Sequence, residues 1–223
     1  MTDPTLLAEV NDFWQAADGV KWHSAANPDK APEVRRFYRW LYDRAVEMLG
    51  RVPERVVDWG CGGGMAAQQM MADGTRYYGV DIVQATLDAC GRAIENAPGT
   101  FVPMLAGIDD PETCFRRINH CDLFVCLTVY QHFPDKAYAA RITRLVAGIL
   151  KLDGLAIIQT RQAGKRRPTN DTRPYKARWM SSVLFNAPEF EKMAESAGLK
   201  VRKTLTGKDW SNGYDYHFCE RIQ

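Results

Sequence analysis

The segment Asp58-Trp59-Gly60-Cys61-Gly62-Gly63-Gly64 decides the fold of this chain. It follows residues 55–58, which predict a short strand, and it precedes residues 65–72, which predict a helix. Glycines at a strand-to-helix turn let the backbone turn tightly, and a ligand can approach the main chain because no Cβ stands in the way. The segment therefore predicts a ligand-binding turn of an α/β fold.

An acidic residue ends the next predicted strand, which covers residues 77–81. A carboxylate at the position of Asp81 can accept hydrogen bonds from both ribose hydroxyls of an adenosine ligand. A dinucleotide fingerprint would read G-x-G-x-x-G, whereas this turn reads D-x-G-x-G-x-G with the acid ahead of the first glycine. The spacing thus favours an adenosine ligand that is not a dinucleotide.

Strands and helices continue to alternate along the chain. The expected segments are a helix that carries Leu87, Cys90 and Ile94, a strand at 100–105, a helix capped by Asp110, a strand at 121–127, a helix capped by Asp135, a strand at 155–158 and a helix at 187–197. This alternation predicts a parallel, doubly wound sheet. A hairpin-like pair of strands, at 199–205 and 214–218, ends the chain and predicts an antiparallel addition.

The N-terminal region differs in pattern. Phe13, Trp14, Trp22 and His23 lie in an aromatic segment that predicts one or two short helices, and residues 33–49 predict a longer amphipathic helix that stops at Gly50. We expect residues 1–50 to form a helical lid on a domain of residues 51–223.

The composition of the chain limits the classes of protein to which it can belong. The chain has 223 residues, and its 29 basic and 27 acidic residues give a net charge of +2, which argues against a nucleic-acid coat protein. It has no apolar run of 18 residues, and its N-terminus lacks the pattern of a signal peptide. Its six cysteines form no C-x-x-C pair and are expected to be reduced, mostly buried thiols. We expect a cytoplasmic protein without membrane contact.

These motifs resemble those of the class I S-adenosylmethionine-dependent methyltransferases. The glycine turn is similar to their motif I, and Tyr78-Gly79-Val80-Asp81 is similar to motif II. Three further stretches resemble the small-molecule branch, namely Asp122-Leu123-Phe124-Val125 with Gln131-His132-Phe133, Leu150-Lys151-Leu152-Asp153-Gly154, and Ala197-Gly198-Leu199. Trp59 and the pair Leu152-Asp153 depart from the family pattern. The resemblance covers about residues 50–223.

The resemblance implies a Rossmann-like, doubly wound α/β sheet of seven strands, mostly parallel with an antiparallel last strand. It implies S-adenosyl-L-methionine as cofactor and S-adenosyl-L-homocysteine as product. The implied cofactor residues are Asp58, Gly60, Cys61, Gly62, Gly64, Asp81, Ile82, Asp109 and Leu127. In these roles Asp58 would approach the amino group, Asp81 would hold the ribose and Ile82 would contact adenine. Asp109 would reach the adenine amino group, with Asp110 as a rival, and Arg35 or Arg36 could pair with the cofactor carboxylate.

Methyl transfer is an in-line displacement, and a hydroxyl acceptor usually needs a base to take its proton. His132, which follows the fourth strand of the sheet, is the first candidate because histidine titrates near neutrality. Tyr130 and His23 are further candidates for the catalytic site. Oxygen is favoured over nitrogen as the methyl acceptor.

A basic loop at about residues 162–178 leaves the fifth strand at the edge where open α/β sheets bind ligands. Its cations, including Arg166, Arg167 and Arg173, predict a small anionic acceptor, and Trp22 is a further candidate contact. Cys114, His120 and Cys121 have poor spacing for zinc, so no metal site is expected. Two alternatives stay open: a tRNA or nucleic-acid methyltransferase, which the missing RNA-binding domain disfavours, and a non-catalytic cofactor-binding partner protein. The sequence does not predict an oligomeric state.

Overall fold

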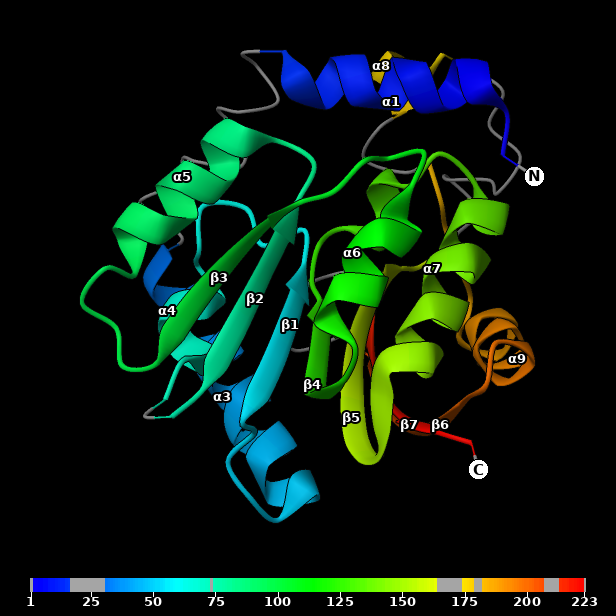
Figure 1. Ribbon diagram of the computed structural model, residues 1–223. Coiled ribbons are helices and arrows are strands. Elements are labelled where there is room, and N and C mark those ends of the chain that lie inside the picture. The colour runs from blue at the N-terminus through cyan, green and yellow to red at the C-terminus, as the bar shows by residue number, and fades with distance from the viewer. Residues whose placement is uncertain are drawn as a thin grey trace.

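The structure is a computed structural model that describes residues 2–16, 31–72, 74–163, 174–178, 182–206 and 213–222. Its centre is a seven-stranded sheet with the order β3-β2-β1-β4-β5-β7-β6 (Figure 1). The strands are β1 (Arg55–Trp59), β2 (Arg76–Asp81), β3 (Thr100–Leu105), β4 (Cys121–Cys126), β5 (Leu150–Arg161), β6 (Leu199–Thr206) and β7 (Tyr214–Arg221). Neighbours among β1 to β5 pair in parallel, whereas β7 runs antiparallel to β5 and to β6.

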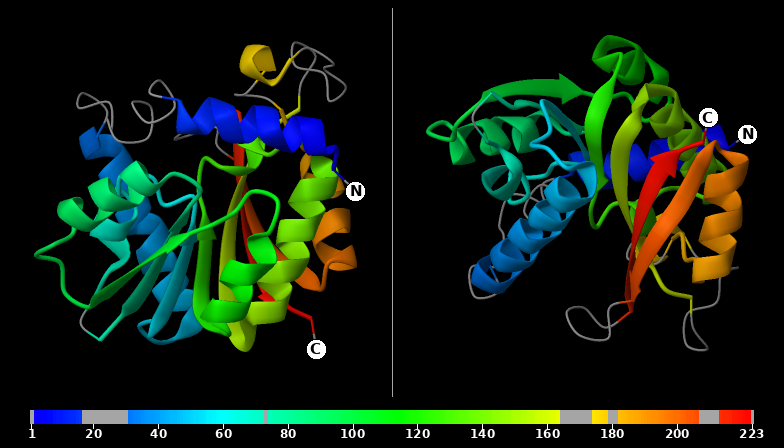
Figure 2. Two further views of the ribbon diagram at one scale, coloured as in Figure 1. Left: turned by 45° about the horizontal axis from the view of Figure 1, so that its top comes forward. Right: turned by 90° about the horizontal axis from the view of Figure 1, so that it is seen from below.

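Helices cover both faces of the sheet (Figures 1 and 2). One face carries α3 (Ala31–Leu49), α4 (Ala67–Met70) and α5 (Gln84–Ala93), and the other carries α6 (Pro111–Ile118), α7 (Lys136–Ile149) and α9 (Ala187–Ser196). Two further helices, α1 (Pro4–Gln15) and α8 (Tyr175–Arg178), lie beside each other across the edge where the parallel strands end. A short 3-10 helix, η1 (Tyr130–His132), follows β4.

The two helical layers explain the apolar strands. Every residue of β4 is buried, because its side chains meet helices on both sides of the sheet. Leu123 and Val125 pack in the core under α3, α4 and α5, whereas Phe124 and Cys126 pack in the core under α6, α7 and α9. Because β1 pairs in parallel with β2 and with β4, the loops after these three strands meet at one edge of the sheet.

The predicted fold is confirmed, with the antiparallel strand in the expected place. Several details differ from the sequence pattern. The strand expected at 155–158 is longer in the structure, where β5 spans Leu150–Arg161. The helix expected at 65–72 shortens to Ala67–Met70, and only β7 of the final pair runs against the sheet, because it is inserted between β5 and β6.

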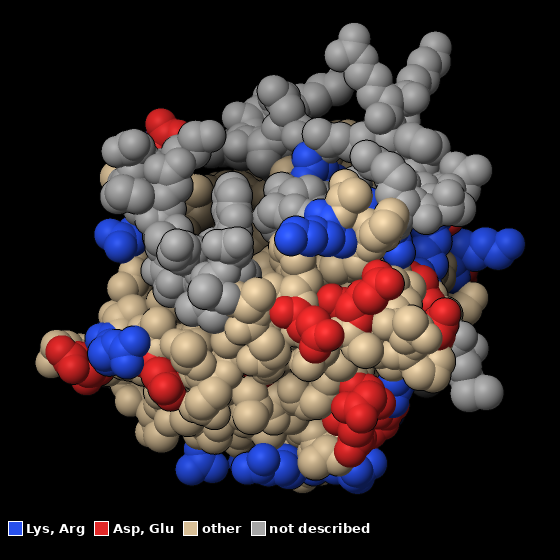
Figure 3. Space-filling view, turned by 90° about the horizontal axis from the view of Figure 1, so that it is seen from above, with Lys and Arg blue, Asp and Glu red and all other residues tan. Residues whose placement is uncertain are grey.

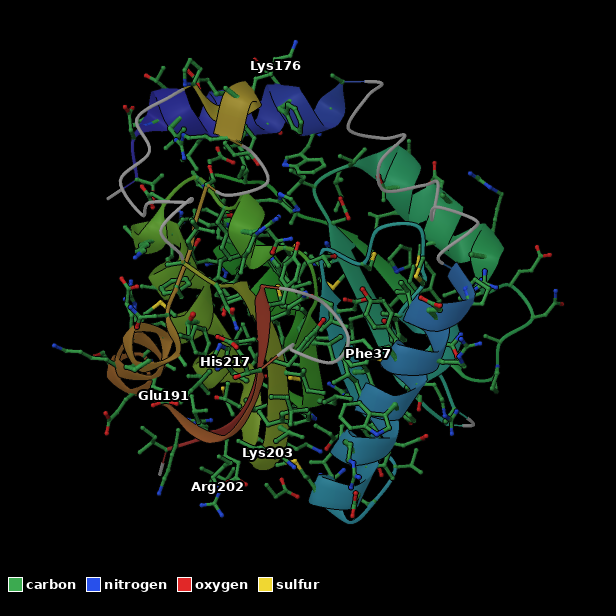
Figure 4. All side chains as sticks on the ribbon, turned by 180° about the vertical axis from the view of Figure 1, so that it is seen from behind. Phe37, Lys176, Glu191, Arg202, Lys203 and His217 are labelled. Atoms are coloured by element: carbon green, nitrogen blue, oxygen red, sulfur yellow. The ribbon has the colours of Figure 1, made fainter. Side chains whose placement is uncertain are left out.

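The first 50 residues divide between two roles. α1 lies over the carboxyl edge of the sheet as a lid would. α3 instead belongs to a helical layer: its Phe37 packs edge-on against Tyr216 of β7, with ring centroids 4.9 Å apart (Figure 4). Within the segment predicted as a lid, α1 thus lies over the carboxyl edge of the sheet, whereas α3 is part of a helical layer.

The two departures from the family pattern have local explanations. Trp59 is buried and stacks on Phe115, with ring centroids 4.8 Å apart, so it fills space under α6. Asp153 pairs with Arg51 at 3.0 Å, while Leu152 is exposed. All six cysteines are free and buried, as predicted.

Candidate functional site

Two pockets meet at the carboxyl ends of β1, β2 and β4, and Gly60 lines both of them. The first has a volume of about 600 Å³ and extends toward the β2 and β3 ends. The second has a volume of about 930 Å³ and extends over the glycine turn toward α3. The sheet reverses its strand order between β1 and β4, and open α/β sheets bind ligands at such a switch point.

The glycine turn is fastened to the end of β2. The backbone N–H groups of Gly60 and Cys61 both donate to the Val80 carbonyl, at 2.8 and 3.0 Å. Gly60 has a φ of +78°, and a Cβ added there would lie 2.3 Å from a methyl group of Val129. Only glycine satisfies both the left-handed backbone and this close approach of the loop after β4.

Asp81 is an acidic residue that lines the first pocket. Its Oδ1 accepts from the Val83 N–H at 3.0 Å and its Oδ2 accepts from the Gly62 N–H at 3.1 Å, so backbone donors orient the carboxylate. A carboxylate held in this way can also accept hydrogen bonds from ligand hydroxyls. The wall beside it is apolar and comprises Ile82, Val83, Ala106 and Ile108. A carboxylate next to an apolar wall fits the ribose and the base of an adenosine.

Asp58 is the corresponding acid of the second pocket. It is 2% exposed, and its Oδ2 accepts a hydrogen bond from the Tyr77 hydroxyl at 2.7 Å. Burial raises the pKa of Asp58 to about 7; the bond from Tyr77 opposes this rise and the nearby charge of Asp81 adds to it. A buried acid of this kind is stabilised by a cationic ligand. Arg35 also lines this pocket, and it offers a partner for a ligand carboxylate.

α1 covers the first pocket. Its Val10 and Trp14 line the cavity, and its Gln15 side chain donates to the carbonyl oxygen of Ile82 at 2.8 Å. Trp14 Nε1 donates to the Tyr175 hydroxyl at 2.9 Å, and that hydroxyl donates to the carbonyl oxygen of His132 at 2.7 Å. These bonds join α1, α8 and η1 above the pocket.

His132 is the titratable side chain on the β4 side of this pocket. It is 9% exposed, and its ring lies edge-on to Trp14 with centroids 5.1 Å apart. The side-chain amide of Gln131 lies 3.1 Å from its Nε2. The imidazole is thus oriented by its neighbours while it borders the cavity.

A family model described as a methyltransferase domain matches residues 32–204. The chain belongs to this methyltransferase family. The match confirms the family predicted from the glycine turn, whose methyl donor is S-adenosylmethionine.

Curated relatives of the methyltransferase include two ubiquinone biosynthesis O-methyltransferases. The one from Acinetobacter baumannii is 29% identical over 140 residues, which is 59% of this chain and 54% of the relative. The one from Bordetella pertussis is 26% identical over 155 residues, which is 69% of this chain and 60% of the relative. The chain spans little more than half of the length of these relatives.

Solved structures share the fold. The magnesium protoporphyrin IX methyltransferase of Synechocystis, solved with S-adenosylhomocysteine, has a TM-score of 0.70 at 15% identity and covers 96% of this chain and 99% of its own. The 1,6-didemethyltoxoflavin-N1-methyltransferase of Burkholderia thailandensis has a TM-score of 0.69 at 16% identity and covers 100% of this chain and 92% of its own. At these identities the likeness concerns the fold alone.

Most of the predicted cofactor residues of the methyltransferase line the two pockets. They are Asp81 and Ile82 in the first, Asp58, Cys61, Gly62 and Leu127 in the second, and Gly60 in both. Gly64 does not line either pocket, and its α-carbon faces Cys90 of α5, so it permits close packing of a helix. Arg35 lines the second pocket, whereas its rival Arg36 does not.

The two acids predicted to reach the adenine amino group, Asp109 and its rival Asp110, do not line the first pocket. Asp109 is exposed outside the lining, and the Asp110 carboxylate accepts from the Thr113 N–H at 3.2 Å as the N-cap of α6. Both acids follow β3, but the chain turns into α6 too early for them to face the cavity. Ile108 and Ala106 take that place.

The structure contradicts the predicted site position of Tyr130. Its hydroxyl shares a hydrogen bond of 2.9 Å with Thr143 of α7, and its ring packs against Phe133 and Phe190 in the core. The η1 turn directs this side chain away from the cavity that His132 borders. The remaining predicted site residues, His23, Trp22, Arg166, Arg167 and Arg173, lie outside the described residues.

His217 has a structural role in β7 (Figure 4). Its two ring nitrogens form hydrogen bonds with Thr160 and Thr204, at 2.9 and 3.1 Å, and its ring stacks on Phe190. Burial lowers the pKa of His217 to about 3, so the ring stays neutral in the core.

The sequence motifs do not indicate the part of the pocket that α1 supplies. Val10 and Trp14 are spaced four apart on one helical face, which is the spacing of any buried helix face. The sequence signal was therefore present but could not be told from ordinary core packing.

Proposed function

We propose that this chain transfers a methyl group from S-adenosylmethionine to a hydroxyl group of a small molecule. The observation that carries the proposal is the junction of two pockets at Gly60, with a carboxylate beside an apolar wall on one side and a buried acid on the other. Asp81 and Ile82 would hold the adenosine half of the cofactor, and Asp58 with Arg35 would hold the methionine half. When bound, the cofactor supplies an electrophilic methyl group.

His132 is the group proposed to take the acceptor proton. It borders the pocket beside Val129, the residue that lies against Gly60. The surrounding lining is largely apolar and includes Trp14, Phe133 and Pro134, so it would exclude water from an aromatic or aliphatic acceptor. The names of the curated relatives, O-methyltransferases, favour oxygen over nitrogen as the acceptor atom.

The test of this proposal is a transfer assay with S-adenosylmethionine labelled in the methyl group. Phenols, amines and tRNA serve as separate acceptors. Label that appears in a phenol or another hydroxyl compound supports the proposal, and label that appears only in tRNA contradicts it. Cofactor binding without transfer to any acceptor would identify a non-catalytic binding protein.

The face above the site bears on the nucleic-acid alternative. Among the residues that the structure describes, acidic and basic side chains lie side by side on this face, and the acidic ones form patches of their own (Figure 3). Nucleic-acid sites instead gather basic residues on one face. The described part of this face differs from such a basic face.

The compartment proposed for the protein is the cytoplasm. Its six cysteines are free, which suits a reducing environment. Within the described ranges, no helix is both long and apolar enough to cross a membrane.

Cofactor affinity should depend on pH through Asp58. Because its pKa is raised to about 7, the carboxyl group of the free protein is protonated below that pH and ionised above it. Only the ionised form attracts the cationic methionine end, so affinity should fall by up to about tenfold for each pH unit below 7. Calorimetry at pH 5.5, 6.5 and 8 measures this. Asp58→Asn should bind weakly at every pH, and a wild-type affinity that is flat across the range would contradict the assignment.

We also propose that the basic loop at 162–178 favours an anionic acceptor. One described residue near the end of this loop, Tyr175, supports the proposal. Its hydroxyl forms hydrogen bonds with the Trp14 side chain and with the carbonyl oxygen of His132, and both residues line the first pocket. Replacing Arg166 and Arg167 with glutamine should raise KM for an anionic acceptor about tenfold, with little effect on cofactor affinity. Added salt should act in the same direction.

A matched control removes two charges elsewhere. Arg202 and Lys203 of β6 lie at the opposite end of the molecule from Lys176 of α8 (Figure 4). Their double replacement by glutamine should leave KM unchanged. Equal KM values in both double variants would refute the role of the loop.

A further inference from the structure

Gln131 is a buried polar residue beside the base proposed for the reaction. The residue is 1% exposed, and it precedes His132 in the η1 turn. Its side-chain amide lies 3.1 Å from Nε2 of the imidazole. The Oε1 atom of this amide is buried and has no hydrogen-bond partner among the residues that the structure describes. Burial of an amide oxygen without a partner is unfavourable, so a glutamine at this position needs an explanation.

Distant segments hold the backbone of both residues in place. The Gln131 carbonyl oxygen accepts hydrogen bonds from the N–H groups of Ser182 and Val183, at 3.0 and 3.3 Å. The His132 carbonyl oxygen accepts from the Tyr175 hydroxyl at 2.7 Å. Because these bonds fix the turn, the amide and the imidazole meet in a set geometry at the wall of the first pocket.

The chemistry of a base decides which end of the amide should face the ring. A neutral imidazole has one N–H and one nitrogen lone pair, and a base takes up its proton on the lone pair. An amide N–H that donates to Nε2 would occupy that lone pair and leave the ring proton on Nδ1. An amide oxygen that accepts from Nε2–H leaves the lone pair on Nδ1. A half-turn of the last side-chain torsion exchanges the two ends of the amide.

The protonated ring has the same requirement. An imidazolium carries a proton on both nitrogens, so only an acceptor can remain bonded to Nε2. In the described part of the chain, Oε1 of Gln131 is a buried acceptor that lacks a donor and belongs to the amide beside Nε2. A hydrogen bond from a charged donor is also stronger than one between neutral groups. Gln131 therefore suits the state that forms when the methyl acceptor loses its proton.

We propose that Gln131 is a positioning residue whose amide oxygen accepts the Nε2–H of His132, so that Nδ1 takes the proton of the acceptor hydroxyl. The proton moves from the acceptor oxygen to Nδ1, and that oxygen forms a bond to the methyl carbon. The electron pair of the carbon–sulfur bond that breaks stays on sulfur. The proposal rests on the proposed function and adds the ring nitrogen that receives the proton.

Gln131→Met keeps the length of the side chain and removes the amide oxygen. The turnover number kcat should fall by about 10- to 100-fold, which is part of the 10²- to 10⁴-fold contribution of a positioned base. KM for the acceptor and the affinity for S-adenosylhomocysteine should stay within about twofold of wild type, because no ligand contact is removed. Steady-state kinetics and calorimetry on one preparation measure these quantities. An amide that instead donated to Nε2 would leave the methionine variant at least as active as wild type.

Gln131→Glu keeps an acceptor oxygen and adds a negative charge. A carboxylate stabilises an imidazolium, so the pH below which kcat falls should rise by about one unit. Above that pH the variant should retain most of the wild-type kcat, whereas Gln131→Met should stay slow at every pH. Rescue by the acidic variant at high pH would separate an acceptor role from a packing role.

The other titratable groups around the imidazole stay the same in this comparison. Among the described residues, Asp81 of β2 and Tyr138 of α7 line the same pocket. The hydroxyl of Tyr175 bonds to the backbone of the histidine, and Glu9 of α1 accepts from the Tyr175 N–H at 3.4 Å. None of these groups is changed in the Gln131 variants, so a shift of the pH profile reports the change at this one position.

Asn96→Asp is the matched control. It makes the same change from amide to carboxylate at an exposed residue that lines neither pocket. Its kcat and its pH profile should equal those of wild type.

Nitrogen NMR of the imidazoles reads the position of the ring proton without any turnover. The chain has four histidines, so isotope-labelled histidine gives few signals, and the signal that is absent from His132→Ala belongs to His132. In the wild-type complex with S-adenosylhomocysteine, the proton of the neutral ring should lie on Nε2. Gln131→Met should lose this preference.

Three results would overturn the inference while leaving the proposed function intact. One is a Gln131→Met protein with the kcat of wild type, and another is a wild-type ring that carries its proton on Nδ1. The third is a joint loss of kcat and of cofactor affinity with a lower unfolding temperature, which would make Gln131 a structural residue. Wild-type protein that transfers methyl groups to no hydroxyl compound would instead overturn the proposed function, and this inference with it.

Discussion

His132→Ala should lower kcat by about 10²- to 10⁴-fold on a hydroxyl acceptor, while the affinity for S-adenosylhomocysteine stays near that of wild type. The imidazole borders the first pocket on the β4 side, and neither Asp81 nor Asp58 contacts it in the described hydrogen bonds. Removing a general base slows proton removal in the transition state without removing a cofactor contact. Steady-state kinetics and calorimetry on the same preparation measure the two quantities.

His120 provides the matched control. It stands immediately before β4, at the amino end of the strand, whereas His132 follows the carboxyl end. His120→Ala should leave kcat within about twofold of wild type. If His132→Ala lowers kcat by less than tenfold, His132 is a packing residue beside Trp14, and the proton leaves by another route.

Asp81→Ala should weaken S-adenosylhomocysteine binding by about 10²- to 10⁴-fold. Two ribose hydroxyls would each lose a hydrogen bond to a charged acceptor, and such bonds contribute about 1.5–3 kcal/mol each. The change also releases the Gly62 and Val83 N–H groups, which the carboxylate holds at 3.1 and 3.0 Å. Loss of these bonds would loosen the glycine turn as well.

The control for this change is Asp88→Ala. Asp88 lies on α5, is exposed, and accepts a hydrogen bond from Gln84 one helical turn earlier. Its replacement removes the same charge without touching either pocket. An Asp81→Ala protein with the affinity of this control would show that the ribose is held elsewhere.

The fold could be predicted because its signals are local. The run at 100–105 became β3 with the expected ends, and Asp110 and Asp135 became the N-caps of α6 and α7. The glycine turn and Asp81 could be placed together because each follows a parallel strand, and neighbouring parallel strands end at one edge of the sheet. Periodicity and capping chemistry suffice for such features.

The rest of the site depends on contacts between distant parts of the chain. Trp14 and Tyr175 are 161 residues apart, and their hydrogen bond joins α1 and α8 at the pocket. Tyr130 was misplaced because its burial depends on Thr143 and Phe190, which no local pattern links to it.

For the predicted adenine contacts, the sequence itself contained a signal against Asp110. Asp110 precedes Pro111 at the start of a helix, and a carboxylate at an N-cap is occupied by backbone N–H groups. That capping role already made Asp110 a poor candidate for a ligand. The same turn places Asp109 outside the pocket, which left Ile108 to face the cavity.

A crystal structure of the chain with S-adenosylhomocysteine tests the central claim most directly. The account predicts that the ribose hydroxyls bond to Asp81 and that adenine lies beside Ile82. The sulfur should lie near Gly60, and the amino group should point toward Asp58. A ligand bound outside these two pockets, or one reversed so that adenine lies against Asp58, would contradict the account.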